Sequence, residues 1–414
     1  MRHLGASLAV VATFAATTVY AQGPERESPP TDAGDAARAL VAPPLTGPHA
    51  VGRRFMVWTD SSRRDPDDST RPRTVALWIW YPAAPSTTRT SEPVLDEQWR
   101  ARRIERLSAK LGPAVARAAG ELRVHAHADA PLLPGEAKLP LLLFTPGLGW
   151  LASDYSVLLE DLASHGYVVA GLAPPGFADV VRFPDGREVV RTLGVGEKIG
   201  TDQTIVHDDA QFVLHRLRAL IGDRASFLHG RVDLDRLGAF GHSLGGTTAL
   251  VLAARDSGVR AAVNLDGDPM GDVLAVRPTQ PLLLVSSESP TIDEAPPGNT
   301  AAHLALVRQG LERSETRRTD DWRRIAANAR EATRIRILGA RHLNFPDAAL
   351  GSAWLVAPKE RWMRVGPIDG ARGLAITAEL VRTFFDRTLR GAGDDTLLRA
   401  PERRFPELRL ETSR

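Results

Sequence analysis

The chain has 414 residues, of which 43% are hydrophobic and 25% are charged, the proportions of a soluble globular protein. Its 52 basic and 50 acidic side chains leave a net charge of +2, which is too small to indicate nucleic acid as a partner. It contains no cysteine, which excludes disulfides, thiolate metal sites and a lipid-modified N-terminal cysteine.

The N-terminal residues have the pattern of a secretory signal peptide. Arg2 supplies the positive charge, residues 4–19 are apolar, and Ala21 is a small residue suited to cleavage. We therefore expect residues 1–21 to be removed and the mature protein to be secreted or periplasmic; a buried or interfacial helix is the alternative. Residues 22–50, rich in Pro, Gly, Asp and Ala, are expected to form a flexible linker.

The next segment combines a strand pair with an insertion. The runs "RFMVWTD" and "TVALWIWYP" predict two strands separated by the polar loop 61–73. Residues 84–137 then break the pattern with two helices, at 96–111 and 113–122, which we interpret as a cap beside an active site. The basic stretch Arg100–Arg106 is expected to be a solvated helix face that could contact a lipid surface.

Histidines in the insertion also offer a metal site. His125 and His127 would project from the same side of a strand, as metal ligands can. No carboxylate partner is evident nearby in the sequence, so a polar strand face is the favoured interpretation, and we expect no metal.

After Pro140 the chain alternates strand and helix. Strands are expected at 141–145, 167–173, 237–242, 261–266, 281–287 and 334–340, and helices at 153–166 (capped by Ser153), 201–220, directly after 242, 301–312, 319–332 and 370–389. Continuous apolar strands that alternate with helices predict a mostly parallel sheet covered on both faces. We expect one α/β domain over residues 51–400, followed by a C-terminal tail at 401–414.

The run Gly241-His242-Ser243-Leu244-Gly245 matches the G-x-S-x-G nucleophile elbow, with a strand before it and a helix after it. Such a turn brings the residues two before and two after the serine so close that side chains there would clash. It also sets the serine at a helix N-terminus, where the N–H of Leu244 could bind an oxyanion. A glycine-softened turn with an incidental serine is the alternative.

A catalytic serine needs a histidine as base and an acid to orient it. In hydrolases with this elbow the chain order is serine, acid, histidine. Only His303 and His342 follow Ser243. His303 lies inside a helical pattern, whereas His342 lies in a loop directly after a strand, so His342 is the predicted base.

Several carboxylates could be the acid. Asp266 ends the strand after the elbow helix, and Asp268 and Asp272 follow it. Glu288 and Asp293 lie beyond the next strand, the commoner position for the acid in such hydrolases. Any of them could instead cap a helix or form a turn.

A second oxyanion donor is expected in "LLLFTPGLGWL". Gly147-Leu148-Gly149 lets a backbone N–H face the pocket, and Leu148 is the predicted donor because Pro146 has no N–H. Trp150 would stand beside the acyl pocket or pack in the core. His242 is expected to pack beside the elbow.

These segments together resemble the plasma-type platelet-activating factor acetylhydrolases and their bacterial relatives, within the α/β-hydrolase superfamily. The resemblance rests on "RTVALWIWYPA", "LPLLLFTPGLGWLASDYSVLLEDLASHGYVVA", "GAFGHSLGGTTAL", "VNLDGD", "LLLVSSES", "GARHLNFPD" and "LVRTFFDRTLRG". It implies an α/β-hydrolase fold, Asp266 as the acid, Leu148 and Leu244 as oxyanion donors, and a non-catalytic place for Glu288. The chain departs from the family at Pro146, where a histidine is usual, and in the run "PPGFADVV".

The expected function is that of a secreted serine carboxylic ester hydrolase that cleaves short or truncated acyl esters, on small molecules or lipids, without a cofactor. Transient contact with a membrane surface is a further expectation, and the sequence leaves the oligomeric state open. A secreted cutinase or polyester hydrolase is the alternative within enzymes. A non-catalytic binding module with a hydrolase fold is the alternative of another class. A peptidase is less favoured, because the sequence shows no extra domain that would select peptides.

Overall fold

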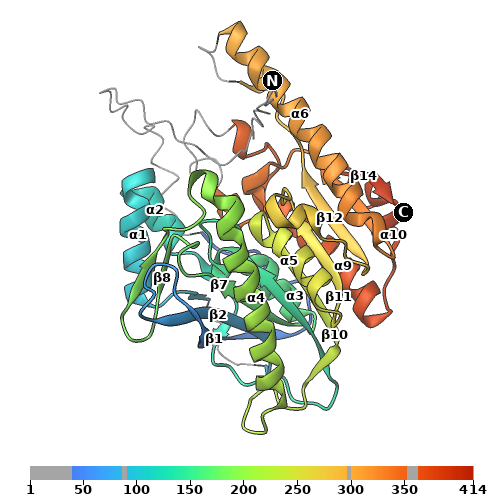
Figure 1. The fold of residues 1–414 in the computed structure, drawn as a ribbon. Coiled ribbons are helices and arrows are strands. Elements are labelled where there is room, and N and C mark those ends of the chain that lie inside the picture. The colour runs from blue at the N-terminus through green and yellow to red at the C-terminus, as the bar shows by residue number, and fades with distance from the viewer. Residues whose placement is uncertain (1–39, 86–90, 296–299, 352–361, 414) are drawn as a thin grey trace, which may run out of the picture.

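The computed structural model describes residues 40–85, 91–295, 300–351 and 362–413, so the expected signal peptide and residues 22–39 of the expected linker lie outside the described residues. A ten-stranded sheet runs through the described part of the chain, with helices on both of its faces (Figure 1). In spatial order its strands are β14 (Leu408–Ser413), β13 (Ala332–Ile337), β12 (Leu282–Ser287), β11 (Val259–Leu265), β10 (Val232–His242), β6 (Leu139–Thr145), β7 (Val168–Ala173), β2 (Pro72–Ala83), β1 (Ala50–Arg64) and β5 (His127–Ala128).

The direction of the strands follows the expected pattern. Neighbours from β13 through β7 are all parallel. At the two ends of the sheet, β14 pairs antiparallel with β13, β2 with β7, and β1 with β2. Two short antiparallel strand pairs lie outside the large sheet. They are β3 (Glu92–Pro93) with β4 (Arg123–Val124), and β8 (Val180–Arg182) with β9 (Glu188–Val190).

Helices cover the two faces of the sheet and form two separate cores. Along β6, Leu142 and Phe144 pack on the face covered by α3 and α9, and Leu141 and Leu143 pack on the face covered by α4, α5 and the end of α6. Because side chains alternate along a strand, a strand buried on both faces must be apolar throughout. The helices are α1 (Glu97–Leu111), α2 (Pro113–Gly120), α3 (Ser156–Ser164), α4 (Ile199–Gly222), α5 (Leu244–Arg255), α6 (Ala301–Ile325), α9 (Gly370–Arg390) and α10 (Thr396–Arg399).

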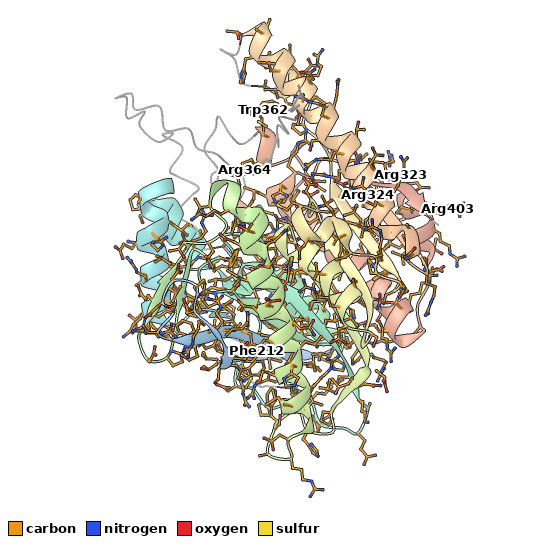
Figure 2. The ribbon with its side chains drawn as sticks, viewed as in Figure 1. Phe212, Arg323, Arg324, Trp362, Arg364 and Arg403 are labelled. Carbon is orange, nitrogen blue, oxygen red and sulfur yellow. The ribbon has the colours of Figure 1, made fainter. Side chains whose placement is uncertain are left out.

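Side chains fill the space between sheet and helices, as Figure 2 shows. Phe212 on α4, for example, is half-buried against the core on the face covered by α4 and α5. Within the described ranges, no helix combines the length and the apolar character that crossing a bilayer requires.

The insertion at 84–137 contains the two expected helices, and it is tied to the sheet by an aromatic cluster. Asp96 caps α1 by accepting a hydrogen bond from the N–H of Trp99. The buried Trp99 ring stacks on Trp78 of β2 with centroids 5.2 Å apart and meets Phe55 of β1 edge-on. Helix α1 is therefore anchored on the sheet by Trp99, its third residue.

Three of the four arginines of α1 do not form the solvated face that the sequence suggested. Arg106 binds Asp179 through two hydrogen bonds of 3.0 Å, and Arg103 lies 2.5 Å from Asp154. Arg102 also contacts Glu188 of β9. These basic side chains attach the insertion to neighbouring segments, because each finds a carboxylate there.

Three expectations about elements were wrong. Residues 301–325 form one helix, α6, where two had been expected. Thr300 caps this helix, and Asp320 and Asp321 pair with Arg323 and Arg324 one turn later. Residues 408–413 of the expected tail form β14, which pairs with β13. Ser153 is not a helix cap, because a 3₁₀ turn at Ala152–Tyr155 precedes α3.

The end of the expected linker is docked on the domain. Both the N–H and the hydroxyl of Thr46 donate to Oδ1 of Asp161 at 2.8 Å. His125 Nε2 lies 2.9 Å from the carbonyl of Pro43, and His127 Nδ1 lies 2.8 Å from Glu92, a carboxylate partner that the sequence had hidden. Among the residues that the structure describes, no three His, Asp or Glu side chains are grouped as metal ligands.

Candidate active site

Polar side chains gather where the parallel strands end. Ser243 follows β10, Asp266 follows β11, Ser287 is the last residue of β12, and His342 lies five residues after β13. These strands are successive neighbours in the sheet. Because their carboxyl ends meet at one edge, residues far apart in the sequence come together there.

The turn at Ser243 requires its glycines. Ser243 has φ 55° and ψ −121°, a strained conformation for a residue with a side chain. A Cβ on Gly241 would lie 2.4 Å from the backbone of Gly245, and a Cβ on Gly245 would lie 1.8 Å from the carbonyl oxygen of Thr145. The turn leads directly into α5, whose Gly246 N–H donates to the Ser243 carbonyl at 3.0 Å.

Ser243, His342 and Asp266 form a continuous hydrogen-bonded row. The Ser243 hydroxyl lies 3.1 Å from Nε2 of His342, and Nδ1 of His342 lies 2.7 Å from Oδ2 of Asp266. Since an ionised carboxylate only accepts, Nδ1 carries the proton and Nε2 is free to accept from the hydroxyl. The side chain of Asp266 is 1% exposed and that of His342 is 37% exposed, so the row leads from the interior to solvent.

The buried carboxylate of Asp266 is held on both oxygens. The N–H of Ser287 donates to Oδ1 at 2.8 Å and its hydroxyl donates to Oδ2 at 2.9 Å. Arg318 of α6 approaches Oδ1 at 3.4 Å. Burial alone raises the pKa of Asp266, but Arg318 and the hydrogen bond from His342 outweigh it and hold the pKa well below the usual range. Asp266 is therefore ionised at neutral pH.

The other carboxylates left open by the sequence have different partners. Asp268 binds Arg318, and Asp272 lies beside His207 and Arg255. Glu288 accepts from the N–H of Gly339 and pairs with Arg341, and Asp293 is exposed in a 3₁₀ turn. His303, the other candidate base, is exposed in the first turn of α6. Of the five acids, Asp266 is the one that contacts His342.

The expected oxyanion loop lies against Ser243. A Cβ on Gly147 would stand 3.2 Å from Cβ of Ser243. Gly149 has φ 88° and donates its N–H to the carbonyl of Phe177, which pins the loop. The side chains of Leu148 and Leu244 share a small apolar cluster, and Trp150 is half-buried against the main core.

The buried residues His242 and Tyr155 form a hydrogen-bonded pair beside His342. The ring of His242 lies 4.6 Å from that of His342 and stacks on Phe345. Its Nδ1 is 2.8 Å from the hydroxyl of Tyr155, and that hydroxyl accepts from the N–H of Gly147 at 3.3 Å. Burial holds the pKa of His242 well below its ordinary value, so this ring is neutral. Tyr155 thus connects the elbow to the oxyanion loop.

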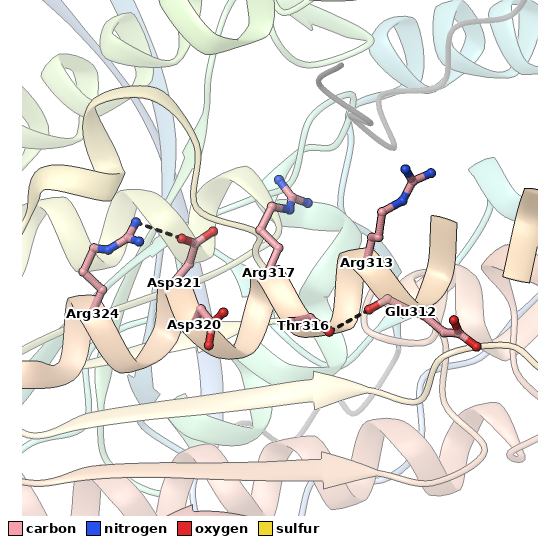
Figure 3. A pocket seen from close by; sticks show the side chains of 7 residues that line it. All are labelled: Glu312, Arg313, Thr316, Arg317, Asp320, Asp321 and Arg324. Carbon is pink, nitrogen blue, oxygen red and sulfur yellow. Dashed lines mark hydrogen bonds and ion pairs between the residues drawn. The ribbon is translucent and has the colours of Figure 1, made fainter. Parts of the chain in front are cut away.

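Two hollows in the described residues lie away from this row. One, of about 460 Å³, opens along α6, where Arg313 and Arg317 point into it and Arg324 pairs with Asp321 (Figure 3). The other, of about 290 Å³, lies between residues 42–46, α3 and α9. Ser243 lines neither, so neither is an acyl pocket for this nucleophile.

Sequence reasoning missed Ser287, Arg318 and Tyr155. Ser287 had a weak signal, because a polar residue ends an otherwise apolar strand. Arg318 had none, since it is one of many arginines on α6 and only the fold brings it to Asp266. Tyr155 had no signal either, because the sequence placed it in the helix after β6.

Comparison with known proteins gives one family. The family model described as platelet-activating factor acetylhydrolase, isoform II, matches residues 36–173 and 223–394, about three quarters of the chain. A probable 1-alkyl-2-acetylglycerophosphocholine esterase of Arthroderma benhamiae is 24% identical over 403 residues, which cover 89% of this chain and 93% of that protein. A platelet-activating factor acetylhydrolase of Bos taurus is 30% identical over 200 residues, 41% of this chain and under half (44%) of that protein.

A solved structure also resembles this fold. The ferulic acid esterase from Streptomyces cinnamoneus superimposes with a TM-score of 0.72 at 26% identity, over 91% of this chain and 100% of that one. The expected α/β-hydrolase fold is therefore confirmed. These matches do not favour the polyester hydrolase that the sequence had left as an alternative.

Proposed function

The chain belongs to the platelet-activating factor acetylhydrolase, isoform II, family and is a carboxylic ester hydrolase, and we propose that it works through an acyl-enzyme on Ser243. The observation that carries the proposal is the row of hydrogen bonds from Ser243 through His342 to Asp266, at 3.1 and 2.7 Å. Family membership also argues against a non-catalytic binding module.

In the proposed reaction the Ser243 oxygen attacks the ester carbonyl while Nε2 of His342 takes the hydroxyl proton. Asp266 keeps the proton on Nδ1 and stabilises the imidazolium that forms. The N–H groups of Leu148 and Leu244 hold the oxyanion. His342 then passes its proton to the leaving alcohol, and a water molecule, activated by the same histidine, releases the acid and restores Ser243.

The proposed substrates are short or truncated acyl esters, on small molecules or on lipids. The names of the relatives support an acetyl group on a glycerophosphocholine. Hydroxycinnamoyl esters are a second candidate class, supported by the likeness to a ferulic acid esterase across the whole of that chain. Trp150 is the residue we propose beside the acyl group in either case.

We also propose that the protein is exported, on the pattern of residues 1–21 alone. The proposed contact with a membrane surface would be transient. The α1 arginines give it little support, because Arg102, Arg103 and Arg106 are already paired with carboxylates.

A fluorophosphonate probe, which reacts only with an activated serine, tests the nucleophile. We expect the wild-type protein to be labelled and Ser243→Ala to lose both labelling and ester hydrolysis, by about 10⁴-fold or more in kcat. Ser257→Ala is the control, because Ser257 is exposed in the turn after α5. Labelling of a folded Ser243→Ala variant would disprove the assignment.

A substrate panel separates the two ester classes. It compares p-nitrophenyl esters of increasing chain length with methyl ferulate and with an oxidised phosphatidylcholine. A kcat/KM that is highest for acetyl and falls with chain length supports the acetylhydrolase, and preference for methyl ferulate supports the second class.

A further inference from the structure

The guanidinium of Arg318 bridges two carboxylates at the inner end of the hydrogen-bonded row. Its Nε and Nη2 bind Oδ1 and Oδ2 of Asp268 at 2.6 and 3.2 Å, and its Nη1 approaches Oδ1 of Asp266 at 3.4 Å. The side chain is 17% exposed. An arginine fork presents its donors in a fixed plane, so the contact with Asp268 also fixes the donor that faces Asp266.

We propose that Arg318 is a positioning residue for ester hydrolysis, which orients the Asp266 carboxylate and, by its charge, sets the pH at which His342 can act as base. The proposal rests on the proposed roles of Ser243, Asp266 and His342. Nothing in the G-x-S-x-G pattern or in the order of the triad points to this residue.

The orientation follows from how the two oxygens of Asp266 are used. Oδ1 receives the N–H of Ser287 and Nη1 of Arg318, and Oδ2 receives the Ser287 hydroxyl and Nδ1 of His342. Without the guanidinium, Oδ1 keeps one donor, and the carboxylate can rotate about its last bond. The His342 ring, which is directed by Oδ2, would then lose its alignment with Ser243.

The helix that carries Arg318 is fixed on both sides of this residue. Trp322 and Ile325, one and two turns later, are buried in the core. Glu315, one turn earlier, binds Arg334 of β13 at 3.0 Å and also contacts Arg336. Arg313 and Arg317 instead point into the hollow along α6 (Figure 3). Arg318 is thus placed toward the acid by the register of α6.

The charges around His342 give the sign of the pH effect. Asp266 and Asp268 are negative and favour a protonated imidazole, whereas Arg318 is positive and disfavours it. The buried ring of His242 is neutral. Other charged side chains on the elements packed around His342 pair with an opposite charge. Arg317 lies 3.9 Å from Asp268, and Glu315 pairs with Arg334 and Arg336. Glu288 and Glu294 pair with Arg341.

Two substitutions should therefore move the pH profile in opposite directions. Arg318→Met removes the positive charge, so the acid limb of the kcat/KM profile moves to higher pH by about 0.5 to 1 pH unit, with a lower plateau. Asp268→Asn removes a negative charge and leaves Arg318 in place, so the acid limb moves to lower pH. Arg318→Lys keeps the charge but not the fork, and is expected to keep the midpoint and lose part of the plateau rate.

The experiment measures hydrolysis of p-nitrophenyl acetate and the rate of fluorophosphonate inactivation from pH 5 to 9 in these variants. Circular dichroism and thermal unfolding report the fold of each variant. If Arg318→Met does not fold, Arg318→Gln, which also removes the charge, takes its place beside the Asp268→Asn shift. A merely structural role would lower the rates and leave every midpoint in place.

An unmoved or lowered midpoint in folded Arg318→Met, or a raised midpoint in Asp268→Asn, would overturn the inference. The proposed function has its own readout, the loss of activity in Ser243→Ala. Inactive Ser243→Ala together with unmoved midpoints would reject the role of Arg318 alone, whereas an active Ser243→Ala would reject the nucleophile itself.

Discussion

The carboxylate of Asp266 accepts a hydrogen bond from Nδ1 of His342 at 2.7 Å from a position where its side chain is only 1% exposed. Asp266→Asn can present an N–H where His342 needs an acceptor, which favours the wrong tautomer of the ring. We expect kcat/KM for p-nitrophenyl acetate to fall by about 10³- to 10⁴-fold with the fold retained.

Glu288→Gln is the matched control for this substitution, because Glu288 is the acid that the sequence left open beyond β12. It accepts from the N–H of Gly339, which a glutamine oxygen can also do, so activity should change little. A large loss in Glu288→Gln with little loss in Asp266→Asn would transfer the acid role to Glu288.

Gly245 cannot carry a side chain where it stands. Its Cβ would lie 1.8 Å from the carbonyl oxygen of Thr145 and 2.7 Å from that of Pro146, both backbone atoms that no rotamer change can move. Gly245→Ala should lose about 3 kcal/mol or more of unfolding free energy, together with activity. Gly310→Ala on α6 meets nothing within 4 Å and should be neutral or stabilising by about 0.5–1 kcal/mol. Chemical denaturation of the two variants checks the contrast.

Tyr155 connects the oxyanion loop with the buried ring of His242. In Tyr155→Phe the N–H of Gly147 loses an acceptor and Nδ1 of His242 loses a partner. We expect kcat/KM to fall by about 3- to 10-fold, because the loop is less firmly held. Tyr167→Phe is the control: it loses a hydrogen bond to Asp386 away from the row, so it should lose stability without that loss of activity. Equal activity losses in the two variants would contradict a specific role for Tyr155.

Glu160 makes the stability of the fold depend on pH. Burial raises the pKa of Glu160 to about 7, although the N–H of His125 donates to its Oε2. The folded state therefore holds a proton that the unfolded chain releases near pH 4.5, and stability from this group is present below that pH and lost as the pH rises to about 7.

Glu160→Gln keeps the neutral shape and removes the titration. We expect the variant to be more stable than the wild type at pH 8, by about 1–3 kcal/mol, and to differ little at pH 4. Thermal unfolding at both pH values measures this, with the exposed Glu136→Gln as control. A stabilisation that is the same at both pH values would contradict the account.

The central strands of the sheet could be predicted from the sequence because most of them are short apolar runs. Runs such as Leu141–Phe144 are apolar throughout, and Ser243, Asp266 and His342 each stand at or after the end of a predicted strand. The structure brings Ser243, Asp266 and His342 into one row, and the glycines of the elbow meet the close backbone that the pattern implied.

The elements that were mispredicted depend on contacts distant in sequence. Strand β14 forms because β13 offers an edge, and residues 41–49 dock because Asp161 and Ser164 of α3 receive them. The sequence predicted a break between two helices at the polar stretch 313–318, yet α6 continues through it. The contact between Arg318 and Asp266 can be predicted only when the register of that continuous helix on the sheet is known.

Helix α6 is buried only near its C-terminal end. Its 25 residues extend for about 37 Å, and its only buried side chains, Trp322, Ile325 and Asp321, lie near the C-terminal end. Arg318 lies between two attachments of the helix: Glu315, one turn before it, binds Arg334 of β13, and Trp322, one turn after it, is buried in the core. Bending of the outer half of α6, N-terminal to Glu315, would therefore leave the guanidinium beside Asp266 in place.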